Sequence, residues 1–314
     1  MRYDYILQRL VLALVVILGV TFVVFLIVQF VPGDPARISL GQQATDAAVE
    51  ARRVEMGLDR PFIVQYGNWL TDTLQGDLGN SLITRQPVTP LIIQRLPATL
   101  QLAGLSLVIG MLIAFPLGII AAINQGGPVD LLATFISQIG VAVPDFWMAI
   151  LLVLLFSSQL EMLPPSGYTP ITEDFLDWLS HMILPALTAG FISASIQTRF
   201  IRSAMLEVIG QNYIRTARAK GLDERSVITK HALRNALITI VTVVGLQVTA
   251  LLSAVVVIEI VFNLPGLGRL ALDAVLDRDY PLLQGSVLVI AVLVTVVNLL
   301  VDLTYFLLDP RVSQ

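Results

Sequence analysis

Six apolar segments, each long enough to cross a lipid bilayer, most strongly limit the folds open to this chain. They cover residues 10–31, 98–123, 129–158, 181–205, 236–262 and 282–308. About 20 apolar residues in a helix span the hydrocarbon core, where every backbone polar group needs a partner. Because 56% of the 314 residues are hydrophobic and only 13% are charged, a soluble globular domain is excluded. The sequence therefore predicts an all-α, polytopic membrane protein with six transmembrane helices in one domain over residues 1–314.

The charges between these segments predict which side of the membrane each loop faces. Residues 199–234 hold 8 of the chain's 19 Lys and Arg residues against three acids, an excess that marks a cytoplasmic loop. Arg2 and Arg9 place the N-terminus on the same side, whereas loop 159–180, which has four acids and no basic residue, belongs outside. We therefore expect both termini and a loop over 206–235 in the cytoplasm. The long polar stretch 32–97 becomes a large external loop subdomain after the first span.

Two amphipathic helices are predicted within this external subdomain. One covers residues 46–56 and ends at Gly57, and the other covers 61–75 behind Asp59, which is a suitable N-cap. The second carries an aromatic-rich face that suits the membrane interface or the helix bundle. Ordinary packing of a small subdomain is the alternative interpretation of that face.

The cytoplasmic loop predicts two short helices with a break between them. Residues 213–220 are good helix formers, and Gly221 follows them as the residue type that tolerates a left-handed conformation. Asp223 then suits an N-cap, with Glu224 in the first turn, where the helix dipole favours an acid. A compact cationic element is thus expected between the fourth and fifth spans.

The sequence lacks the residues that catalysis or metal binding would need. A nucleotide-binding loop requires Gly-Lys-Ser/Thr, and the only two lysines, Lys220 and Lys230, follow Ala219 and Thr229. There is no cysteine, and the only two histidines are 50 positions apart at the edges of apolar segments. We therefore predict no catalytic residue, no metal site, no cofactor on this chain and no enzymatic activity of its own.

Polar residues inside the apolar segments are the candidates for a translocation path. Asp145 is the clearest, because an ionised carboxylate near the middle of a span costs about 2.5–3.5 kcal/mol and Pro144 beside it can interrupt the helix. Gln138, Gln247 and Glu259 are further candidates. Each either lines the path or serves as a structural partner for a neighbouring helix, and both interpretations stay open.

Several long motifs, in order along the chain, carry a family resemblance. They are RTARAKGLDERSVITKHALRNALI at 215–238, FVPGDPAR at 30–37, MGLDRPFIVQYGNWL at 56–70, GDLGNS at 76–81, EIVFNLPGLGRL at 259–270, RDYPLLQG at 278–285 and LLDPR at 307–311. The chain resembles permease subunits of binding-protein-dependent ABC importers, in the peptide/nickel (dipeptide/oligopeptide) branch with the type I permease fold. It departs from the general Glu-Ala-Ala-x-x-x-Gly motif, since Arg215, Thr216 and Ala217 precede Gly221 at those positions. A proline common after this loop is replaced by Ile238 and Thr239.

The resemblance implies an ATP-driven importer in a bacterial or archaeal plasma (inner) membrane. Its expected partners are a homologous second permease, two ABC ATPase subunits that carry ATP and Mg²⁺, an external substrate-binding protein and membrane lipid, with no nucleic acid. The residues expected to couple the chain to an ATPase are Tyr213, Arg215, Thr216, Ala217, Arg218, Lys220 and Gly221.

Several cargoes and one other transport class remain open. Di- or oligopeptides, or a related small peptide such as glutathione, would enter the cytoplasm by alternating access. Nickel chelates and oligosaccharides are the alternative cargoes within the same family. A self-sufficient secondary transporter is the alternative class, and it predicts a series of titratable groups through the bundle, for which only Asp145 qualifies well.

Overall fold

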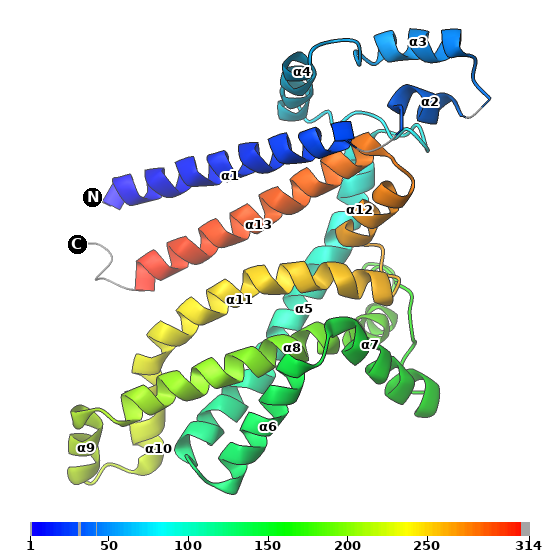
Figure 1. The fold of residues 1–314 in the computed structure, drawn as a ribbon. Helices are drawn as coiled ribbons and strands as arrows, with labels where there is room; N and C mark the ends of the chain where they lie inside the picture. Colours follow the sequence, from blue (N-terminus) through cyan, green and yellow to red (C-terminus); the bar gives the residue numbers. More distant parts are fainter. Residues whose placement is uncertain (1, 31–32, 42, 309–314) are drawn as a thin grey trace. The chain divides into compact units, whose positions relative to one another are not determined.

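The computed structural model describes residues 2–30, 33–41 and 43–308, and these form helices with no β-strand among them (Figure 1). The all-α prediction is confirmed. Residue 31 at the end of the first predicted span, residues 31–32 of the FVPGDPAR motif and residues 309–311 of the LLDPR motif lie outside the described residues. The contacts within the chain form two compact units, each discontinuous in sequence. Unit 1 is built mainly from Leu100–Leu264, and unit 2 from Leu7–Thr99 and Pro265–Val296.

Unit 1 is a helical bundle organised around one long helix, α8. Its elements are the part of α5 (Val88–Ile123) from Leu100 onward, α6 (Pro128–Ala142), α7 (Asp145–Val153) with a π-helical end (Leu154–Gln159), α8 (Phe175–Ile209), α9 (Asn212–Ala219), α10 (Glu224–Ser226), a π-helical segment (Val227–Leu233) and α11 (Arg234–Val261). α8 packs against α6, α7 and α11. It is rich in small buried residues such as Ala186, Ala189 and Ala194, which let neighbouring backbones approach closely.

The contact between α5 and α8 depends on glycines that face each other. A Cβ built at Gly110 would lie 3.1 Å from the Gly190 carbonyl oxygen, and one at Gly118 would lie 2.7 Å from Ile201 Cγ2. Interfaces of this kind are typical of membrane helices, where close packing replaces the hydrophobic driving force.

Gly118→Ala is therefore expected to destabilise unit 1. The added methyl group would push against Ile201 and the Thr198 carbonyl oxygen, and overpacking of this kind costs about 1–3 kcal/mol. Gly104→Ala on the same helix is the matched control, since a Cβ there meets nothing within 4 Å. Thermal unfolding of the detergent-purified transporter should show a lower midpoint for Gly118→Ala only. Equal midpoints for both variants would contradict close packing of α5 on α8 at Gly118.

The third predicted span is not one straight helix. α6 and α7 meet at 107°, with Val143 in an extended conformation and Pro144 at the N-cap of α7. Proline has no N–H to continue the helix and disfavours a helical conformation in the residue before it. Among the described residues, five other helical stretches are long and apolar enough to span a membrane, and a sixth is counted if α6 and α7 are one broken span. The five are Leu7–Val28, Val88–Ile123, Phe175–Ile209, Thr239–Val261 and Tyr280–Leu303.

Unit 2 combines parts of long helices with several short ones. Its elements are α1 (Arg2–Phe30), α2 (Pro35–Leu40), α3 (Asp46–Glu55), α4 (Phe62–Leu74), α12 (Leu267–Leu276) and α13 (Tyr280–Leu308). α1 and α4 are joined by aromatic contacts, with ring centroids 5.4 Å apart for Phe25–Phe62 and for Phe22–Tyr66. The aromatic-rich face of α4 thus packs on α1.

The first predicted short helix is confirmed with an end one residue earlier, whereas the predicted cap of the second is wrong. α3 ends at Glu55, and its N-cap is Thr45, whose Oγ1 accepts a hydrogen bond from the Ala48 N–H at 3.3 Å. α4 begins at Phe62 with Pro61 at the N-cap position and no side-chain cap, so the predicted Asp59 cap is wrong.

A buried carboxylate ties two distant parts of unit 2 together. Asp279, just before α13, accepts hydrogen bonds from the Ser81 hydroxyl and, at 3.1 Å, from the Leu82 N–H. Ser81 and Asp279 are 198 residues apart in sequence, and both are buried. The link fixes the segment before α5 against the start of α13.

Candidate functional site

The cationic loop between α8 and α11 has a short helix, α9, that is anchored by one buried face. Ile214 and Ala217, three residues apart on α9, are buried in a cluster with Met205 of α8 and with Val227 and Ala232 of the π-helical segment. Residues three apart lie on the same side of a helix. α9 therefore packs on the rest of unit 1 through its apolar side.

The opposite face of α9 presents cations to solvent. Tyr213, Arg215, Thr216, Arg218 and Lys220 are all exposed. The structure thus divides the predicted coupling residues between two faces, because Ala217 is buried whereas the other side chains point outward. α9 therefore has one apolar side and one cationic side.

Gly221 ends this helix in a conformation that requires glycine. Its φ is +78°, and a Cβ placed there would meet nothing within 4 Å, so the requirement comes from the backbone and not from crowding. The Lys220 N–H donates to the Thr216 carbonyl at 3.0 Å and the Gly221 N–H to the Arg218 carbonyl at 2.9 Å. The predicted helix end is therefore confirmed.

Two acids order the chain after Gly221. The Asp223 carboxylate accepts from the Ser226 N–H at 2.9 Å, which confirms the predicted N-cap. Glu224 accepts from Arg218 at 2.6 and 3.1 Å, and this hydrogen bond holds the pKa of the Glu224 carboxyl below its ordinary value of 4.5. The pair therefore stabilises the loop fully at a pH above 4.5. This stabilisation is lost only as the pH falls through the lowered pKa of Glu224. The pair therefore keeps its charge throughout the neutral range.

A second charged pair in unit 1 was not identified from the sequence. Arg202 on α8 donates to both carboxylate oxygens of Asp130 on α6, at 2.6 and 2.7 Å, and the Gly126 N–H donates to the same carboxylate at 2.9 Å. The Asp130 side chain is 5% exposed and that of Arg202 is 29% exposed. The only sequence signal was that Asp130 is an acid at the second position of the apolar segment 129–158. The pair joins the α5–α6 turn to α8 close to the loop that carries α9.

The four path candidates lie on three helices and do not form one cluster. Asp145 is half-buried in the first turn of α7, directly after the break, and Gln138 is exposed on α6. Gln247 is half-buried and Glu259 fully buried on α11, about 18 Å apart along the helix. Gln138 lines a 430 Å³ cavity between α6 and α8, where the sequence had not placed Arg199, Arg202 and Ser203.

The chain is similar to known proteins over nearly its whole length. Residues 114–314 match the family model described as the binding-protein-dependent transport system inner membrane component, and residues 2–103 match its N-terminal counterpart. A putative peptide transport system permease protein of Brucella suis biovar 1 is 44% identical over 98% of both chains. The dipeptide transport system permease protein DppB of Escherichia coli K12 is 39% identical over 99% of both chains.

Solved structures show the same fold at low sequence identity. The MetNI methionine ABC transporter in an inward-facing conformation superposes with a TM-score of 0.59 at 16% identity, covering 70% of this chain and 96% of that chain. An amino acid ABC transporter gives 0.51 at 18% identity, covering 71% and 94%. With two family models that together match most of its length and full-length relatives near 40% identity, the chain belongs to the family of inner membrane permease components of binding-protein-dependent ABC importers and has the type I permease fold.

Proposed function

We propose that this chain is the membrane-spanning permease subunit of an ATP-driven importer for dipeptides and oligopeptides. The cargo is inferred from relatives named as peptide and dipeptide permeases. Glutathione falls within the same class of small peptides. Nickel chelates and oligosaccharides are the alternative cargoes.

The exposed cationic face of α9 on a buried anchor is the observation that carries the coupling role. Ile214 holds the helix, while Arg215 and Lys220 are exposed and can meet an ATPase subunit, and the exposed Arg218 is paired with Glu224. α8 leads into α9, and α10 and the π-helical segment connect α9 to α11. Movement of α9 would therefore be transmitted to both α8 and α11. ATP and Mg²⁺ bind to two ATPase subunits, which carry out hydrolysis, and not to this chain.

Closure and separation of the two ATPase subunits would then open the translocation path alternately to the outside and to the cytoplasm. A homologous second permease completes the translocation path, and an external binding protein delivers cargo near the 32–97 region. Both termini and the 206–235 loop face the cytoplasm of a bacterial or archaeal cell, and lipid surrounds the spans. In this arrangement Asp145, Gln138, Gln247 and Glu259 are candidates for the path, with Asp145 favoured because Pro144 interrupts the helix beside it.

Reconstitution of the whole transporter tests this function. The permease pair, the ATPases and the binding protein in liposomes should import labelled dialanine only when ATP is present inside. Import without ATPase subunits would instead support a self-sufficient secondary transporter. Import of a nickel chelate or an oligosaccharide, with no peptide uptake, would reassign the cargo.

Gly221→Ala should lower the amount of peptide imported per ATP hydrolysed in the same assay. Alanine in a left-handed conformation costs about 1–2 kcal/mol, which disfavours the bent loop that presents α9. Gly210→Ala is the matched control, since Gly210 has a helical φ of −73° and its built Cβ lies 3.5 Å or more from other atoms. A Gly221→Ala transporter that couples as well as Gly210→Ala would count against the role of this loop.

A further inference from the structure

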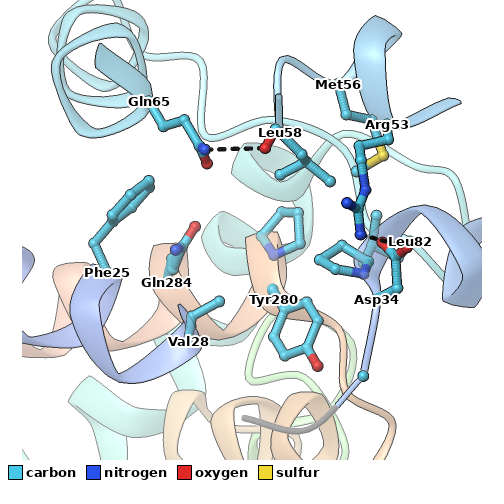
Figure 2. A pocket seen from close by; sticks show the side chains of 13 residues that line it. Phe25, Val28, Asp34, Arg53, Met56, Leu58, Gln65, Leu82, Tyr280 and Gln284 are labelled. Carbon is cyan, nitrogen blue, oxygen red and sulfur yellow. Dashed lines mark hydrogen bonds and ion pairs between the residues drawn. The ribbon is translucent and has the colours of Figure 1, made fainter. Parts of the chain in front are cut away.

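Unit 2 contains a pocket of about 540 Å³, which we call the unit 2 pocket (Figure 2). One wall comes from the ends of α1 and α13, through Phe25, Val28, Tyr280 and Gln284, and another comes from the short helices and their connections. The volume lies within the range of about 300–1,000 Å³ typical of small-molecule sites. Every lining residue belongs to unit 2.

Hydrogen bonds and ring contacts hold the wall opposite α13 in place. The Gln65 side-chain amide donates to the Arg60 carbonyl at 2.7 Å and to the Leu58 carbonyl at 3.3 Å, so it closes the connection between α3 and α4. Phe25 of α1 contacts Tyr66 of α4 with ring centroids 5.5 Å apart. The pocket is thus formed by the fold before any ligand is present, which reduces the entropy cost of binding.

Two polar side chains on α13 are buried at the pocket and lack partners within the described part of the chain. The Tyr280 hydroxyl has no hydrogen-bond partner among the described residues, and the side chain is 5% exposed. Gln284 is 7% exposed, and no described residue bonds to its amide, which extends from α13 toward Gln65 and Leu58 in Figure 2. Buried polar groups are normally hydrogen-bonded, so an unpartnered amide at a cavity wall indicates a missing ligand group.

The edge of the pocket carries one charge of each sign. Arg53 of α3 lies 3.0 Å from Asp34, whose other carboxylate oxygen caps α2 by accepting from the Ala36 N–H at 3.0 Å. The Asp34 side chain is 22% exposed and that of Arg53 is 44% exposed, so the pair itself contributes little to stability. A ligand with both charges can therefore separate the pair at small cost and provide each residue with a new partner.

We propose that the unit 2 pocket binds a free dipeptide or α-amino acid as a zwitterion. The ligand ammonium group would pair with Asp34, its carboxylate with Arg53, and a peptide amide with Gln284, while Phe25 and Met56 surround a small apolar side chain. This inference rests on the proposed peptide function and adds a second point of selection, within the permease itself and separate from the binding protein.

Binding of radiolabelled dialanine to the assembled transporter in lipid nanodiscs, without its binding protein, tests the proposal. N-acetyl-dialanine lacks the ammonium group and dialaninamide lacks the carboxylate, and each should compete about tenfold less well than dialanine. With Asp34→Asn, N-acetyl-dialanine should compete as well as dialanine, while dialaninamide stays weaker. With Arg53→Gln, dialaninamide should compete as well as dialanine, while N-acetyl-dialanine stays weaker. Gln284→Leu should weaken all three ligands by a similar factor.

The neighbouring ion pair supplies the matched control. Arg37 and Asp46 lie 2.6 Å apart in the same subdomain and do not line the pocket, so Arg37→Gln and Asp46→Asn should leave all three affinities unchanged. The proposal is overturned if the wild-type complex shows no saturable dialanine binding, or if Asp34→Asn and Arg53→Gln behave like these controls. Because uptake with the binding protein is measured separately, persistent import in either case leaves the proposed function standing. A loss of all peptide import in the wild type would refute that function instead.

Discussion

Ile214→Ala is expected to separate ATP hydrolysis from transport while leaving the membrane helices folded. Ile214 is fully buried and, with Ala217, is the apolar anchor of an eight-residue helix. Replacing a buried isoleucine with alanine costs about 2–5 kcal/mol, and a helix this short has little other stability to offset the loss. The number of peptides imported per ATP hydrolysed by the reconstituted transporter should fall by at least about tenfold.

A conservative variant separates this anchoring role from a general packing defect. Ile214→Val removes one methylene group and costs about 0.5–1.5 kcal/mol, so coupling should stay near the wild-type ratio. Thermal unfolding of both variants checks that α8 and α11 remain intact. If Ile214→Ala hydrolyses ATP and imports peptide at the wild-type ratio, α9 does not transmit force through this contact.

The second large effect is expected at the pair between Asp130 and Arg202. Arg202→Ala leaves the Asp130 carboxylate, only 5% exposed, without its cation, and loss of one partner of a buried pair costs about 3–5 kcal/mol. Asp130→Ala should be milder, because the Arg202 guanidinium is 29% exposed and can still reach water. The midpoint of thermal unfolding of the purified transporter should therefore fall further for Arg202→Ala.

The double variant distinguishes a true pair from two independent positions. Removing both charges leaves no isolated ion. The double variant should therefore lose less unfolding free energy than the sum of the losses in the two single variants. Additive losses would show that neither residue depends on the other. Such a result would also remove the pair as the link between the α5–α6 turn and α8.

Local features of this chain could be read from its sequence because they depend on neighbouring residues. Long apolar runs predicted the helices, and the residue types at Gly221 and Asp223 predicted one helix end and the next helix start. The Asp59 prediction failed for a local reason as well. Gln65 bonds the carbonyls of Leu58 and Arg60, and the helix starts one residue later than expected, at Phe62.

Features that depend on distant segments could not be predicted in this way. Asp130 and Arg202 are 72 residues apart, and only the packing of α6 on α8 brings them together. The presence of Pro144 indicated an interruption, but the 107° bend depends on how α7 packs on α8 and α11. The unit 2 pocket draws on residues from Phe25 to Gln284, so no local pattern marks it.

The link between Ser81 and Asp279 also has a consequence for biosynthesis. The serine leaves the ribosome 198 residues before its acceptor, which corresponds to about 10–40 s at 5–20 residues per second. During that interval the amino-terminal part of unit 2 exists without the Asp279 carboxylate that later bonds to it. A chain that terminates before residue 279 would therefore leave this early-synthesised region unfinished, although every residue of the region is present.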